Sequence, residues 1–221
     1  CTSAATCEPC MIPARKIRMA RSVKGSPRVS KSKKTDSVRD AAGAAAPAAA
    51  PGPDLARARR VVLDLLGIPG KSGEERAIAA RICQWLKEAG CPRSAFSFDD
   101  VHTKTPLKGD VGNLVVQLPG TLPGPRRLLM AHMDTVPVCV GTKPVVSGRF
   151  VKSGNPATGL GADDRAGCAV VLSTALEILE KKLPHPPLTF FFAIQEEVGL
   201  YGARFAKAAT LGRPKLACNF D

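Results

Sequence analysis

One histidine and five carboxylates stand where this chain could bind metal ions and transfer protons. They are His132, Asp134, Asp163, Glu196, Glu197 and Asp221. Imidazole nitrogen and carboxylate oxygen are the ligands of zinc in hydrolytic sites, and a glutamate that stays free of the metal can take a proton from water. This mixture of side chains predicts a metal-dependent hydrolase that activates water.

The histidine ends the apolar run "RRLLMAH", residues 126–132, and Asp134 follows two positions later. Side chains alternate along a strand, so His132 and Asp134 would project to the same side if the extended conformation continues. A metal-bound imidazole is typically oriented by a carboxylate on its other ring nitrogen. We therefore expect Asp134 to orient His132.

The acidic pair Glu196 and Glu197 emerges directly after the run "FFFAI". Two adjacent side chains at the end of a strand cannot easily point the same way, which favours one metal ligand and one general base. Asp163 follows "GLGA" just before a helix, where Asp164 could cap the helix. Asp221 ends the run "ACNF".

Carboxylates that gather this closely need a cation to offset their repulsion. Two metal ions about 3.5–4 Å apart, with one carboxylate bridging them, would supply it. Each feature also has a structural explanation: a histidine at a strand end, a solvated acidic loop, and a helix cap. Their convergence on one edge of one sheet favours a functional site.

The rest of the sequence predicts strands that alternate with helices. Apolar runs bounded by glycine and proline predict strands at 113–120, 127–132, 187–194 and 215–220. Helical spacing of apolar residues predicts helices at 54–68, 72–90, 163–182 and 201–210. We expect an α/β fold, a three-layer sandwich whose mostly parallel sheet is covered by helices on both faces. Ligands bind beyond the carboxyl ends of the strands in such sheets.

Two of the helices carry more detailed signals. Ser72 stands three residues before Glu75, which predicts a capping box, and Gly90 is expected to end that helix. In 163–182, four apolar residues are expected near one face: Ala166, Val170, Leu176 and Leu179.

Three motifs then carry a family resemblance. "AHMDTVP", "GLGADDRAGCAVV" and "QEEVGLYGA", in this order, resemble the signatures of the co-catalytic zinc exopeptidases that include peptidase T, aminoacylase and glutamate carboxypeptidase. The resemblance covers residues 54–221, the first part of the family's catalytic domain. The interval of 31 residues from His132 to Asp163 favours the peptidase T-like members over the related glutamyl-aminopeptidase group, which carries a large insertion there.

The resemblance implies a role for each residue. His132 and Asp221 would bind one zinc ion, Asp163 would bridge two, and Glu197 would bind the second. Glu196 would be the general base and Asp134 would orient the histidine. Co²⁺ or Mn²⁺ could replace zinc. The resemblance also implies a cis peptide bond between Asp163 and Asp164.

These roles imply hydrolysis of short peptides by a tripeptide-type aminopeptidase. An aspartate at position 221, where some carboxypeptidase and deacylase relatives carry glutamate, favours an aminopeptidase. One alternative is a deacylase of N-acyl amino acids, or a carboxypeptidase, on the same scaffold. Another is an inactive pseudoenzyme that only binds its partner.

Relatives complete the site with a further histidine beyond a lid or dimerisation domain, whereas this chain stops at Asp221. His102 and His185 are not expected to replace it. We therefore expect the fold to be incomplete at the C-terminus, the natural protein to be longer and to form homodimers through that domain, and the 221-residue chain to be inactive by itself.

The basic charge is concentrated in the first quarter of the chain. Residues 1–53 hold ten Lys or Arg and three acidic residues, or +7 of the formal net charge of +13. Rich in Ala and Pro, this segment is expected to be a disordered tail. A transit peptide, an over-extended reading frame and a phosphate-binding tether are the alternatives. Without interleaved aromatic residues or a membrane-length apolar run, we expect neither a nucleic-acid partner nor a membrane partner.

The eight cysteines are scattered rather than paired in a scaffold. This spacing predicts buried, reduced thiols and a reducing, cytoplasmic compartment. The Cys7-x-x-Cys10 pair has no second pair near it and is not expected to bind metal.

Overall fold

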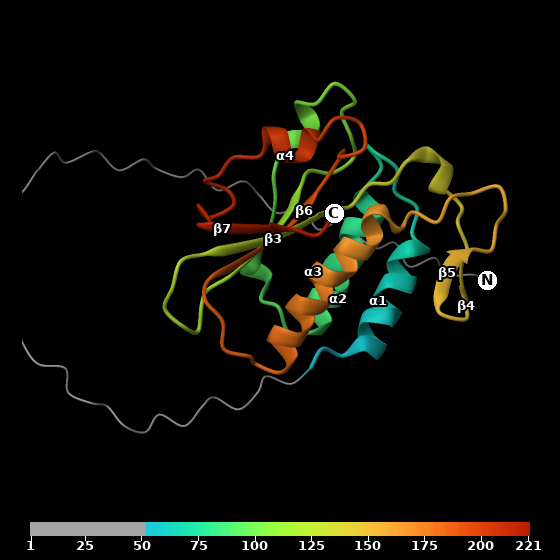
Figure 1. Ribbon diagram of the computed structural model, residues 1–221. Coiled ribbons are helices and arrows are strands. Elements are labelled where there is room, and N and C mark those ends of the chain that lie inside the picture. Colours follow the sequence, from blue (N-terminus) through green and yellow to red (C-terminus); the bar gives the residue numbers. More distant parts are fainter. Residues whose placement is uncertain (1–51) are drawn as a thin grey trace, which may run out of the picture. The chain divides into compact units, whose positions relative to one another are not determined.

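A computed structural model describes residues 52–221, which form seven strands and four α-helices (Figure 1). The predictions for the tail, including its disorder and Cys1, Cys7 and Cys10, lie outside these residues apart from positions 52 and 53. Within the described part, the fold matches the α/β architecture that the sequence predicts.

The main sheet has five strands in the order β1-β2-β6-β3-β7. Their bounds are β1 Phe96–Phe98, β2 Leu114–Leu118, β3 Arg127–His132, β6 Leu188–Ala193 and β7 Leu216–Asn219. Strand β3 pairs in parallel with both β6 and β7, and β2 pairs antiparallel with both β1 and β6. Four strands therefore share one direction and only β2 opposes them, which confirms a mostly parallel sheet.

A separate hairpin of β4 Pro144–Ser147 and β5 Phe150–Ser153 was not predicted. Its turn includes Gly148 at φ +59°, a conformation that glycine adopts without steric cost. Most of its side chains are exposed, so the hairpin lacks the apolar alternation that reveals a strand in sequence.

Helices cover both faces of the main sheet, unequally. Helices α1 Leu55–Leu66, α2 Arg76–Glu88 and α3 Ala162–Glu180 lie on one face, and α4 Tyr201–Phe205 lies on the other (Figure 1). None of the helices in the described part is both long and apolar enough to cross a membrane. The predicted three-layer arrangement is confirmed.

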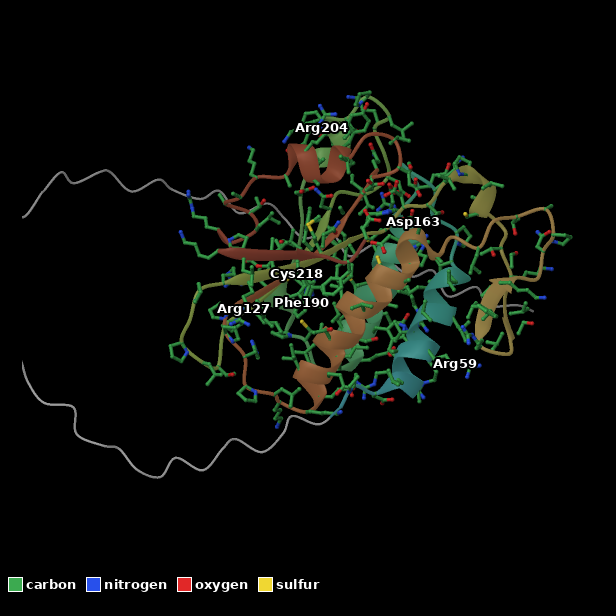
Figure 2. The ribbon with its side chains drawn as sticks, viewed as in Figure 1. Arg59, Arg127, Asp163, Phe190, Arg204 and Cys218 are labelled. Carbon is green, nitrogen blue, oxygen red and sulfur yellow. The ribbon has the colours of Figure 1, made fainter. Side chains whose placement is uncertain are left out.

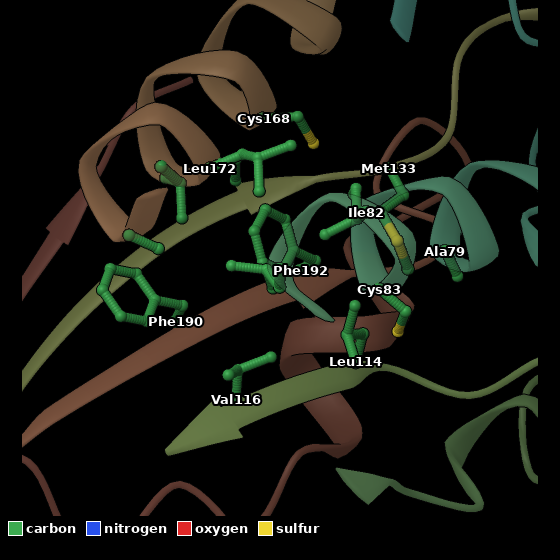
Figure 3. Close-up of a cluster of buried hydrophobic side chains, with 14 of the residues drawn as sticks. Ala79, Ile82, Cys83, Leu114, Val116, Met133, Cys168, Leu172, Phe190 and Phe192 are labelled. Atoms are coloured by element: carbon green, nitrogen blue, oxygen red, sulfur yellow. The ribbon is translucent and has the colours of Figure 1, made fainter. Parts of the chain in front are cut away.

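The larger core lies under the three helices. Phe190 and Phe192 of β6 are fully buried there beside Ile82 of α2 and Leu172 of α3 (Figure 3). Because strand side chains alternate, Phe191 points to the opposite face, where it joins a smaller apolar cluster. This alternation lets one strand anchor both layers.

Two helix predictions need correction. The helix predicted for 201–210 ends at Phe205, because Ala206 is extended and packs against the smaller cluster. In α3, Leu176 is buried but Ala166 and Val170 are exposed. Val170 and Leu176 are six residues apart, which places them about 120° from each other around a helix, so they do not share one face.

The buried face of α3 instead follows Cys168, Leu172 and Ala175. At α2, Gly90 ends the helix as predicted: its φ is +85°, and the Cys91 N–H donates to the Leu86 carbonyl at 2.9 Å. The capping box is wrong, because α2 begins without a side-chain cap.

Among the five described cysteines none forms a disulfide. Cys83, Cys91 and Cys168 are buried as predicted, and Cys139 is half-buried. Cys218 is exposed on β7, whose four side chains are all exposed at the edge of the sheet (Figure 2). Burial was therefore wrongly predicted for Cys218.

Gly167→Ala is expected to lower the free energy of unfolding by about 1–3 kcal/mol, the cost of overpacking. A Cβ at Gly167 would lie 2.2 Å from Asp164 Oδ1 and 2.5 Å from the Phe220 carbonyl oxygen. Urea unfolding measures the change. Gly67→Ala is the matched control, because its Cβ would meet no atom closer than 3.5 Å. Equal stability of both variants would contradict the close packing of α3 on the end of β7.

Candidate metal and active site

The carboxyl ends of β3, β6 and β7 bring the predicted site residues together around one imidazole. His132 Nε2 lies 3.0 Å from Asp163 Oδ1 and 3.8 Å from both Glu196 Oε2 and Asp221 Oδ1. Asp163 stands at the start of α3, beside these strand ends (Figure 2). Parallel pairing places the ends of the three strands at the same edge, so residues 89 positions apart in sequence become neighbours.

Asp134 is completely buried behind the histidine. Its Oδ1 lies 3.3 Å from His132 Nδ1. The same carboxylate accepts hydrogen bonds from the Glu196 N–H at 2.9 Å, the Glu197 N–H at 3.2 Å and the Ser72 hydroxyl at 2.7 Å. Asp134 therefore holds both the imidazole ring and the backbone of the acidic pair.

The carboxylates of Glu196 and Glu197 lie in different positions relative to the other potential ligand atoms. Glu197, Asp163 and His132 form one group whose potential ligand atoms all lie within 4.8 Å of one another. Glu196 belongs to no such group within the described residues, although its carboxylate stays within reach of His132. The two adjacent glutamates therefore differ in their position relative to the other potential ligand atoms.

Asp164 and Asp221 form a second group with His132. Both oxygens of Asp164 are already engaged: Oδ2 accepts from the His132 N–H at 3.0 Å and Oδ1 from the Gly167 N–H at 2.8 Å. Asp164 therefore binds backbone N–H groups near the start of α3, whereas the Asp221 carboxylate remains available as a metal ligand. The Asp163–Asp164 peptide bond is cis, as the resemblance implies.

Comparisons with known proteins show which proteins this chain resembles. The profile of Peptidase family M28 matches residues 113–221. The uncharacterized protein YqjE of Bacillus subtilis is 34% identical over 147 residues, covering 64% of this chain and 37% of its own. A probable carboxypeptidase of Emericella nidulans is 32% identical over 148 residues, covering 64% of this chain and 31% of its own.

Two solved structures share the fold. A tripeptidase of Staphylococcus aureus has a TM-score of 0.68 and 28% identity, and the aminopeptidase PepT of Bacillus cereus has 0.69 and 27%. Each alignment covers 76% of this chain and 44% of the other. In sequence and fold, the chain is similar to metallopeptidases of the M20/M28 type. It spans about a third of the length of the curated relatives it matches.

The site around His132 is strongly acidic. Burial opposes the charged form of His132, but the carboxylates of Asp134, Asp164 and Asp163 outweigh it and raise its pKa to about 9. Burial also raises the pKa of Glu196 and Glu197, and neighbouring carboxylates add to the rise.

The negative charge of the site indicates whether divalent metal ions would fit there. Among residues 52–221, no lysine or arginine forms an ion pair with the four carboxylates around His132 Nε2, which are Asp163, Glu196, Glu197 and Asp221. Imidazole nitrogen and carboxylate oxygen are both ligands of divalent zinc in proteins. The residues present therefore fit bound divalent cations.

Sequence reasoning missed the contacts of two further residues beside this site. The Ser72 hydroxyl bonds to Asp134, and the buried Glu75 Oε1 accepts from the Gly73 N–H at 2.8 Å and the Gln195 N–H at 3.1 Å. Burial, with Asp134 nearby, raises the pKa of Glu75 to about 7. The Ser-x-x-Glu spacing was the only signal, and it predicted a helix cap.

The other described histidines lie outside both ligand groups. His102 is in a short 3-10 turn, and His185 Nδ1 lies 2.8 Å from the Pro186 carbonyl oxygen.

Proposed function

We propose that the protein hydrolyses short peptides as a tripeptide-type aminopeptidase, with residues 54–221 supplying the first part of its catalytic domain. The observation that carries this proposal is the convergence of Asp163, Glu196 and Asp221 within 3.8 Å of His132 Nε2. The similarity to a tripeptidase and to the aminopeptidase PepT supports the choice of substrate.

Two divalent ions, zinc in the first instance and Co²⁺ or Mn²⁺ as substitutes, would be held by four residues. His132 and Asp221 would hold one ion, Glu197 the other, and Asp163 both. Asp221 and Glu197 fall in different groups of potential ligand atoms, which supports their assignment to different ions. When bound, such ions polarise the scissile carbonyl and make water a stronger nucleophile near neutral pH.

The chain's own residues perform the proton transfers. The Glu196 carboxylate takes a proton from the attacking water and passes it to the nitrogen of the leaving amine. Asp134 keeps His132 in one orientation, since its carboxylate lies 3.3 Å from Nδ1. Its hydrogen bonds to the Glu196 and Glu197 N–H groups hold the acidic pair toward the same point.

A carboxypeptidase is the second candidate, because several curated relatives carry the name probable carboxypeptidase. Both activities hydrolyse an amide by the same proton transfers. They differ in whether the free amine or the free carboxylate of the peptide is recognised. A deacylase of N-acyl amino acids would use the same proton transfers and would likewise differ in the part of the substrate that it recognises.

A paired hydrolysis assay separates these activities. The full-length protein with zinc is expected to release the first residue of an unblocked tripeptide and to leave an N-acetyl amino acid and an N-blocked dipeptide intact. EDTA should abolish turnover and added zinc should restore it, because the ions polarise the carbonyl. Cleavage of only the N-blocked dipeptide would establish a carboxypeptidase, and cleavage of only the acetylated amino acid a deacylase. Turnover that survives complete removal of metal would contradict the proposed site.

A further inference from the structure

Glu75 is a completely buried carboxylate that the proposed chemistry leaves without a role. It stands immediately before α2, yet it does not cap that helix. Its Oε1 instead accepts the Gln195 N–H at 3.1 Å, across 120 positions of sequence, and the Gly73 N–H at 2.8 Å. Its carboxylate therefore joins the loop before α2 to the turn after β6.

The Gln195 backbone needs such support. Gln195 lies between the end of β6 and the acidic pair, with φ +52°, a left-handed conformation that disfavours residues with a Cβ. This conformation turns the chain so that the next two N–H groups face Asp134. A different conformation at Gln195 would redirect Glu196 and Glu197.

Three consecutive N–H groups, those of Gln195, Glu196 and Glu197, thus donate to just two buried carboxylates. Asp134 takes two of them and Glu75 takes the first. Ser72, from the same loop as Glu75, donates to Asp134 and couples the two carboxylates. A backbone held at three successive points has little freedom to rotate its side chains away from the site.

We infer that Glu75 is a positioning residue that sets the orientation of the Glu196 carboxylate through the Gln195 N–H. This inference rests on the proposed function, because Glu196 needs precise placement only if it transfers protons. Glu75 itself is shielded from solvent and does not touch the substrate. For this role, Glu75 must place an acceptor oxygen within hydrogen-bond distance of the Gln195 N–H. Its negative charge is not required.

Two substitutions at Glu75 separate the effect of the position of the acceptor oxygen from the effect of the negative charge. Glu75→Gln keeps an acceptor oxygen at the same reach and removes the charge, whereas Glu75→Asp keeps the charge and withdraws the oxygen by one methylene. In the full-length protein at saturating zinc, Glu75→Asp is expected to lower kcat about 10–100-fold, the usual effect of losing an outer partner of a metal site. Its KM should stay within about twofold, and Glu75→Gln should retain most of the wild-type kcat.

Hydrogen exchange of residues 195–197 gives a second measurement that needs no substrate. Exchange should accelerate in Glu75→Asp and stay near wild type in Glu75→Gln, because only the first loses the acceptor. Glu74→Gln is the matched control: Glu74 is adjacent, 65% exposed, and pairs only with Lys71 among the described ion pairs. It should alter neither kcat nor exchange.

Wild-type kcat in Glu75→Asp, or an equal loss in both variants, would overturn the inference. Failure of both variants to fold would also overturn it, since Glu75 would then be needed for the core. If the wild-type protein cleaves no test substrate, the proposed function fails. In that case, unchanged exchange in Glu75→Asp would independently reject the positioning contact.

Discussion

Glu196→Gln in the full-length protein is expected to reduce kcat by about 10²–10⁴-fold, the range of general acid–base catalysis. The amide cannot accept the proton of the attacking water, so the step that creates the nucleophile loses its base. Glu196 belongs to neither group of potential ligand atoms, and bound metal should therefore remain at the wild-type level. The substitution preserves the shape of the side chain and the N–H bond to Asp134.

Steady-state kinetics on the tripeptide and metal analysis of the same samples test this expectation. Glu197→Gln is the matched control, because it changes the adjacent residue in the same way but removes a proposed ligand. It should lose metal as well as activity. If Glu196→Gln also loses metal, Glu196 is a ligand and the two glutamates have been assigned the wrong way round.

Asp163→Asn is expected to weaken metal binding at least about 100-fold, since losing even an outer partner of a metal site costs about 10–100-fold. Asp163 Oδ1 lies 3.0 Å from His132 Nε2, and its carboxylate is the proposed bridge between the ions. An amide has one acceptor oxygen and no charge, so it cannot bridge two cations or offset their charge. The amount of bound metal should fall from two ions per chain toward one.

Calorimetric titration with zinc and metal analysis after dialysis measure this loss. Asp164→Asn is the matched control, because both carboxylate oxygens of Asp164 already accept hydrogen bonds from backbone N–H groups. That variant should unfold at a lower temperature but keep its metal stoichiometry. Unchanged zinc affinity in Asp163→Asn would rule out a bridging role for Asp163. Loss of metal in Asp164→Asn alone would move that role to Asp164.

Much of this site could be predicted because its residues follow elements that sequence reveals well. Long apolar runs indicate buried strands, and parallel neighbours must end at one edge of the sheet. The sequence therefore predicts that His132, Glu196 and Asp221 lie together, as they do in the structure. The family resemblance separated Asp163 from Asp164, but the physical reason for the separation needed the structure. Both are aspartates at the start of one helix, and only the hydrogen bonds of Asp164 show that its oxygens are used.

By itself, the sequence determined the α/β class, the main strands and helices, and the residues that meet at the strand ends, because each of these depends on local periodicity or on strand termination. Only the tertiary structure decided that β2 opposes the other strands, since a buried apolar run looks the same in either direction. It also decided that Ser72 and Glu75 support the acidic pair rather than cap α2. Those contacts join residues 62 and 120 positions apart, and no local pattern records which distant N–H or carboxylate a buried side chain will meet.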